Sequence, residues 1–144
     1  MKKIIICILT FLFVLPSFAN GVGYINYGKI LENYQYSKQI LRELDTKETE
    51  IIKYLQKKEE EYNKLESAVQ KNKLEETVKT EMRTKEKAFE DFKNKKEEDV
   101  YNKIHAASEK IRLEKRLDAI IDRDCVFSGG IDITDEIIKL LNGQ

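Results

Sequence analysis

A run of one hundred residues, 29–128, contains neither glycine nor proline, and most of its positions are Lys, Glu, Leu, Ile, Asn or Gln. Glycine and proline are the residues that disfavour helix most strongly, whereas lysine, glutamate and leucine favour it. Because a helix usually ends near such a residue, a run without any indicates a very long helical region. The chain is therefore predicted to be mainly α, with any strands confined to the two ends of this region.

Apolar residues in this region repeat with the spacing of a coiled coil. One row contains Leu44, Ile51 and Leu65, and a second contains Leu41, Glu48, Leu55, Tyr62 and Val69. The stripe continues through Leu74, Val78, Met82, Phe89 and Phe92, and then through Val100, Ile104, Ala107 and Ile111. Polar residues at positions 48 and 58 interrupt it, which favours a loosely packed or bending seam over a rigid rod.

Periodicity alone does not separate one long rod from a hairpin. The most polar point, "QKNKLEE" at residues 70–76, is the candidate tip of a hairpin, with Asn72 as a left-handed cap. A hairpin there makes residues 37–116 an arm about 55 Å long at ~1.5 Å per residue. Both ends of the helical run then meet at one base.

Short strand-like segments flank the arm. They are "VGYINY" at residues 22–27, "AIIDRDCVF" at residues 119–127 and "GIDI" at residues 130–133, the last two joined by a tight glycine turn. Thr134 is a suitable N-cap for a last helix, whose buried face holds Ile137, Ile138, Leu140 and Leu141.

The first nineteen residues predict export. Lys2 and Lys3 precede an apolar run at residues 4–15, and the small residues Ser17 and Ala19 suit a signal peptidase. We expect cleavage after Ala19, which places the mature protein outside the cytoplasm. A retained membrane helix is the alternative, but about a dozen apolar residues are too short for a hydrocarbon core of ~30 Å.

The mature chain is slightly acidic. Without Lys2 and Lys3 it has 24 basic and 26 acidic residues, so its net charge of about −2 argues against nucleic acid as a partner. Cys125 is the one cysteine left, which excludes an intramolecular disulfide. We interpret Cys125 as a small buried residue of a strand, with an intermolecular disulfide or a reactive thiol as alternatives.

The segments outside the arm are too short to fold alone. Residues 20–36 and 117–144 form a body of 45 residues without a disulfide or a metal. We therefore expect strands of several copies to build one shared core, which makes the oligomer obligate. The candidate core residues are Tyr24, Ile25, Ile120, Ile121, Val126 and Phe127.

Nothing in the sequence requires an active site, so we expect no enzyme, cofactor or metal. In "SGGIDITDEII", residues 128–138, acidic side chains disfavour a phosphate loop and their spacing departs from that of an EF-hand. His105 is the single histidine and lacks a partner at metal-ligand spacing. The glycine segment is best explained as a joint between a strand and the last helix.

The second half of the arm has the only positive surplus. Formal charges are −1 for residues 38–78, +3 for residues 79–116 and −4 for residues 117–144. Two phenylalanines in this half either fill the seam or contact an apolar client. The candidate client contacts are Phe89, Phe92, Lys79, Arg83, Lys85 and Lys87.

Both ends of the chain resemble the OmpH-like (Skp) periplasmic chaperones. The resemblance rests on "GYINYGKILENY" near the start and "LDAIIDRDCVFSGGIDITDEIIKLLN" near the end. It implies a homotrimer with a small β body and three helical hairpin arms, which hold unfolded outer-membrane proteins in a cavity without ATP. It also implies weak contact with membrane surfaces, although the family is often more basic than this chain. A structural or adaptor coiled coil of the cell envelope is the alternative function.

Overall fold

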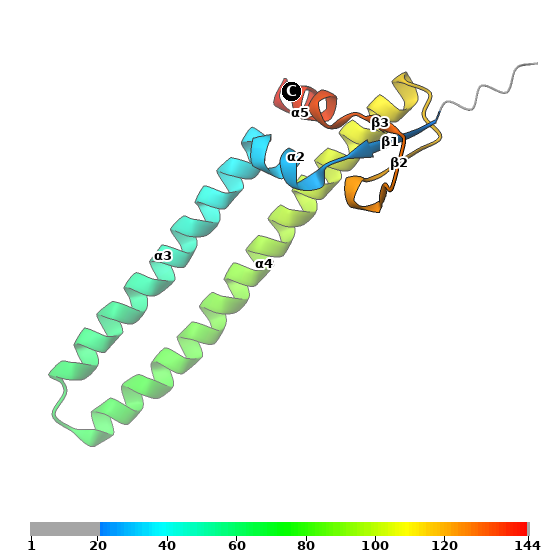
Figure 1. Cartoon of the computed structure of the whole chain (residues 1–144). Coiled ribbons are helices and arrows are strands. Elements are labelled where there is room, and N and C mark those ends of the chain that lie inside the picture. The colour runs from blue at the N-terminus through cyan, green and yellow to red at the C-terminus, as the bar shows by residue number, and fades with distance from the viewer. Residues whose placement is uncertain (1–20, 144) are drawn as a thin grey trace, which may run out of the picture.

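The computed structural model describes residues 21–143, so the predicted signal peptide lies outside the described residues. The elements are β1 (Val22–Ile25), α2 (Tyr27–Asn33), α3 (Gln35–Lys64), α4 (Ala68–Glu114), β2 (Ala119–Asp122), a 3-10 turn (Arg123–Cys125), β3 (Ile131–Asp132) and α5 (Thr134–Asn142). Helices α3 and α4 form a long hairpin, and the other elements gather at its open end (Figure 1). The predicted class, mainly α with a small sheet, is confirmed.

The turn of the hairpin precedes the predicted tip. Helix α3 ends at Lys64 and α4 begins at Ala68, so residues 70–76 lie in the first turns of α4 and Asn72 caps no helix. Leu65 and Ser67 adopt extended backbone with ψ of 132° and 125°. The prediction was wrong because the chain reverses direction through residues with ordinary extended backbone. Such a turn does not require glycine or proline, so no residue type marks it in the sequence.

The first helical segment is also interrupted where the sequence predicts continuity. Asn26 caps α2 by accepting a hydrogen bond from the Lys29 amide on Oδ1. One residue, Tyr34, then leaves the helical conformation with φ −78° and ψ 119° before α3 begins. The arm is thus joined to the base by the continuous helix α4 on one side and by a broken helix on the other.

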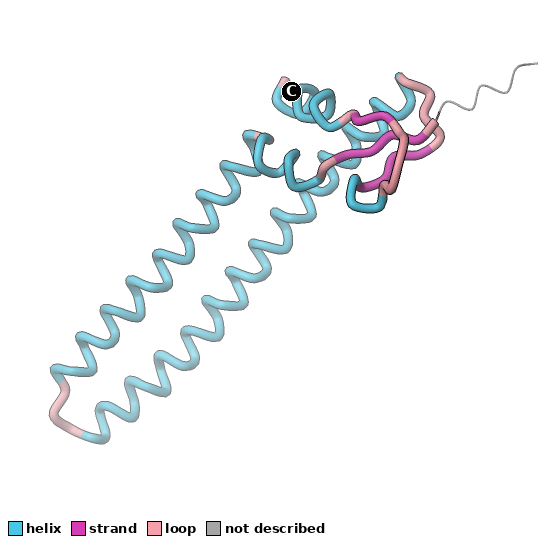
Figure 2. The backbone as a smooth tube through the Cα atoms, in the orientation of Figure 1, coloured by secondary structure: helices cyan, strands magenta, loops and turns pink. Residues whose placement is uncertain are grey.

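The sheet has three parallel strands in the order β2-β1-β3 (Figure 2). The expected tight turn between the second and third strands is wrong, because β3 pairs with β1 on the side opposite β2. Gly129 and Gly130 have φ of 81° and 88°, a region open mainly to glycine. They let the chain cross from one edge of the sheet to the other.

The second predicted strand is shorter than expected. It stops at Asp122, whose carboxylate accepts the Asp124 amide and starts the 3-10 turn. Cys125 lies in that turn and is exposed, so its interpretation as a buried strand residue was wrong. A local side-chain hydrogen bond thus outcompetes the strand tendency of the apolar residues that follow.

The hydrophobic core lies at the base of the arm. Ile30, Ile133 and Ile137 are fully buried there, and Ile104 and Ile111 of α4 pack with them. Each fully buried isoleucine contributes about 1.5–3 kcal/mol. Gly23 packs closely under this core, since a Cβ at that position would lie 2.8 Å from Cδ1 of Leu117 and the Leu117 side chain would have to move.

Thr134 has a different role from the predicted cap. It is buried as the first residue of α5, and its side chain caps no amide of that helix. Its Oγ1 accepts a hydrogen bond from the Asn26 amide at 3.0 Å and donates one to Asp132 Oδ1. Thr134 therefore ties the end of the first strand to the start of the last helix.

Candidate functional site

The surface of the arm is open away from its base. No residue from 41 to 99 is buried, although the apolar stripe of both helices runs along the seam between them. The stripe residues Ile51, Leu74, Val78, Met82, Phe89 and Phe92 are all half-buried. A two-helix hairpin covers only the seam side of each helix, so apolar surface stays accessible from the flanks.

Hydrogen bonds between tyrosines and carboxylates bridge the seam. Tyr36 Oη donates to Asp99 Oδ2 at 2.6 Å, and Tyr54 Oη donates to Glu81 Oε2 at 2.5 Å. The hydrogen bond to the carboxylate raises the pKa of each of these phenols to about 12. Both tyrosines are therefore neutral donors at neutral pH.

Lysines on aromatic rings form a second set of bridges. Lys47 of α3 lies 4.6 Å from the ring centre of Phe92, and Lys85 of α4 lies 4.7 Å from that of Tyr54. Lys96 also forms an ion pair with Glu43 at 2.9 Å, which lowers the pKa of that carboxyl. Such contacts are individually weak at exposed sites. The arm is therefore held by many small polar interactions.

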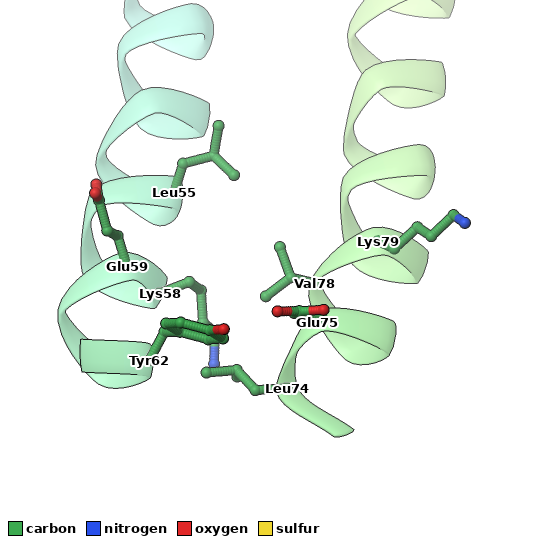
Figure 3. Close-up of a pocket in the computed structure, with 8 residues that line it drawn as sticks. All are labelled: Leu55, Lys58, Glu59, Tyr62, Leu74, Glu75, Val78 and Lys79. Atoms are coloured by element: carbon green, nitrogen blue, oxygen red, sulfur yellow. The ribbon is translucent and has the colours of Figure 1, made fainter. Parts of the chain in front are cut away.

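A groove of about 460 Å³ lies near the tip, between α3 and α4 (Figure 3). Its apolar side chains are Leu55, Tyr62, Leu74 and Val78, and its charged ones are Lys58, Glu59, Glu75 and Lys79. A second, smaller groove of about 160 Å³ lies farther toward the base and includes Ile51 and Phe89. Both combine a small apolar floor with charges of both signs, which suits weak contact with an extended amphipathic chain.

The six candidate client contacts separate in the structure. Phe89 and Phe92 lie on the side of α4 that faces α3, Lys79 lines the tip groove and Lys85 covers Tyr54. Arg83 and Lys87 are exposed and line neither groove. Phe89 lines the second groove. The apolar residues of the tip groove were not among the candidates, although the heptad spacing already placed Leu55, Tyr62, Leu74 and Val78 on the stripe.

The candidate oligomer residues fall into two groups. Ile25 and Ile120 pack against the core of their own chain. Tyr24 and Val126 are half-buried, whereas Ile121 and Phe127 are exposed, with Phe127 at 105%. Both outer strands of the sheet also have a free edge within residues 21–143. The body therefore exposes the apolar side chains of Ile121 and Phe127, together with the unpaired backbone groups of two strand edges.

The glycine segment holds a structural network. The Asp132 carboxylate accepts hydrogen bonds from the Thr134 hydroxyl and amide, and these bonds lower the pKa of Asp132. Across residues 21–143, His, Cys, Asp and Glu side chains form no group that could hold a metal ion. No helix in the same part of the chain is long and apolar enough to span a membrane.

Comparison with known proteins identifies the family. The model of the family described as outer membrane protein (OmpH-like) matches residues 21–141. No curated protein matches the chain. A similar solved structure is that of a Caulobacter crescentus CB15 protein assigned as an OmpH-like outer membrane chaperone. It is 13% identical, and the match covers 85% of this chain and 84% of that chain with a TM-score of 0.41. Since the family model spans nearly all of the described residues, the chain belongs to the OmpH-like family.

Proposed function

We propose that this protein is an ATP-independent holdase chaperone of the periplasm, which binds unfolded outer-membrane proteins between its helical arms. The observation that carries the proposal is the open seam of the arm, where half-buried apolar residues lie next to charged ones from residue 41 to residue 99. Membership of the OmpH-like family supports the same conclusion.

The weakness of each contact suits this task. An unfolded barrel protein exposes alternating apolar and polar residues, and its strands aggregate when they meet. Shallow grooves such as the one around Leu55 and Val78 bind single apolar side chains weakly. Many such contacts along several arms add up to firm retention, and each can be released without an energy source.

We further propose that three copies assemble through the body. The exposed Ile121 and Phe127 and the free strand edges are surfaces that a monomer would leave in water. A trimer joined at the body places the three arms around one cavity. Sedimentation of the mature protein at micromolar concentration is expected to show a trimer, and a compact folded monomer would contradict it.

Aggregation of a client tests the holdase activity. A urea-unfolded outer-membrane barrel is diluted with and without the purified protein, and light scattering is followed. We expect suppression at one trimer per client. Leu55→Ser combined with Val78→Ser is expected to weaken it, because both residues line the tip groove. Leu113→Ser is the matched control, since Leu113 is 65% exposed outside the grooves. No suppression by the unmodified protein would overturn the proposal.

A further inference from the structure

The break between α2 and α3 has no cause within its own segment. Residues 29–41 contain no glycine or proline, yet Tyr34 is extended. Helical hydrogen bonds continue on both sides, from the Tyr34 amide to Ile30 O at 2.8 Å and from the Lys38 amide to Tyr34 O at 3.2 Å. Sharp helix breaks usually have an identifiable cause. Here the hydrogen-bond partners at the break come from a distant part of the chain.

Asn142, the last residue of α5, bonds to both sides of the break. The Gln35 amide donates to Asn142 Oδ1 at 2.9 Å, and Asn142 Nδ2 donates to Asn33 O at 3.0 Å. A side-chain amide offers one acceptor and two donors, so it can replace a backbone partner on each side of a break. Asn142 thus satisfies the two backbone groups that flank Tyr34.

An unbroken helix is the competing arrangement. It would join the amides of residues 35–37 to the carbonyls of residues 31–33, and none of these bonds is present in the structure. The hydroxyl of Ser37 is buried and has no hydrogen-bond partner among the described residues. In a continuous helix the serine hydroxyl commonly donates to the carbonyl four residues earlier, which is that of Asn33. In this structure the Asn33 carbonyl instead accepts a hydrogen bond from Asn142.

We propose that the junction between α2 and α3 is a two-state hinge whose broken state is held by the docking of Asn142. Burial of Tyr34 and the two Asn142 bonds favour the broken state, while three backbone bonds and a partner for Ser37 favour the continuous one. Two packings separated by so few interactions are typical of conformational switches.

The hinge would set the direction of α3 relative to the body. Figure 2 shows α2 leaving the line of α3 at the break. Since α4 continues unbroken into the base, α3 would have to slide along α4 when the hinge changes state. The cross-seam hydrogen bond of Tyr54 and the contact of Lys47 with Phe92 would have to be exchanged in that motion, and such contacts are individually weak. The use of this motion, to change the spacing of the arms around a client, rests on the proposed function.

The Asn142→Ala variant tests the hinge by residue-resolved hydrogen exchange of the mature protein without client. If Asn142 holds the break, the amides of Tyr36 and Ser37 enter helical bonds and exchange about tenfold more slowly. If Tyr34 packing alone holds it, the Gln35 amide loses its acceptor and exchanges faster while the other two do not change. That second result overturns the proposal. Asn102→Ala, on the exposed side of α4, is the control and is expected to leave the exchange rates of the Gln35, Tyr36 and Ser37 amides unchanged.

A locked variant covers the case in which Asn142→Ala fails to fold. Gln35→Pro fits the broken state, because proline is favoured at the first helical position and keeps the preceding residue extended, as Tyr34 already is. If the Gln35→Pro, Asn142→Ala double variant folds and Asn142→Ala alone does not, the role of Asn142 is to hold the break. If both unfold, the proposal is wrong. These readouts need no client, so failure of the holdase assay leaves them intact.

Discussion

The hydroxyl of Tyr54 on α3 donates a hydrogen bond to the carboxylate of Glu81 on α4, with 2.5 Å between the two oxygens. Twenty-seven residues and the hairpin turn separate the two positions in the chain. The bond therefore exists only when the hairpin is closed, and it marks the register of the two helices in a stretch where no side chain is buried.

Removing this hydroxyl tests its part in closing the arm. Tyr54→Phe is expected to lower the free energy of unfolding by about 0.5–1 kcal/mol, because the bond is charge-assisted but exposed to solvent. Thermal unfolding followed by circular dichroism measures the change. Tyr101→Phe is the control, since Tyr101 is 55% exposed. Equal effects of the two substitutions would show that the bond to Glu81 does not stabilise the arm.

Alkaline pH is expected to loosen the arm. The pKa of Tyr36 and of Tyr54 rises from 10.0 to about 12 in the folded chain, mainly through the bonds to Asp99 and Glu81. A raised pKa means that the stabilisation is complete below pH 10 and is lost as pH rises toward 12. Urea unfolding at a series of pH values measures this loss. The Tyr36→Phe, Tyr54→Phe double variant should show a smaller decline, and an unchanged decline would contradict the assignment.

The two phenylalanines of α4 are predicted to stabilise the seam. Phe89 and Phe92 are half-buried on the side that faces α3, and Lys47 covers the ring of Phe92. Replacing both with serine is expected to cost about 2 kcal/mol, roughly half the value of two fully buried rings. Val69→Ser, at a site 78% exposed, should change stability little. Unchanged thermal stability with lost suppression of aggregation would instead make the two rings client contacts.

Thr134 is expected to tolerate serine but not valine. Valine keeps the shape of the side chain, yet it removes the acceptor of the Asn26 amide and the donor to Asp132. A buried donor left without a partner costs about 1–3 kcal/mol. Thr134→Ser retains the hydroxyl and should lose much less. Urea unfolding of both variants measures the difference, and similar losses would mean that the methyl group matters more than the hydrogen bonds.

The long helices and their apolar stripe were predictable because helix propensity and periodicity are local properties of the chain. The same holds for the first strand and for the last helix with its buried face of Ile137 and Leu141. The turn at residues 65–67 was not predictable, since Leu65 and Ser67 adopt backbone angles open to most residues. The grooves of the arm were partly predictable, because the heptad spacing identified most of their apolar residues. It did not show how far the facing helix buries each of them.

The sequence by itself determined the class, the extent of the helical region and the family, since these depend on composition, spacing and short motifs at the two ends. Only the tertiary structure decided the order of the strands, the exposure of Cys125 and the break at Tyr34. Each of these depends on partners far away in the chain or on local hydrogen bonds that compete with propensity. Asn142 shows the physical reason most directly, because its amide bonds to both sides of a helix break more than one hundred residues earlier in the sequence.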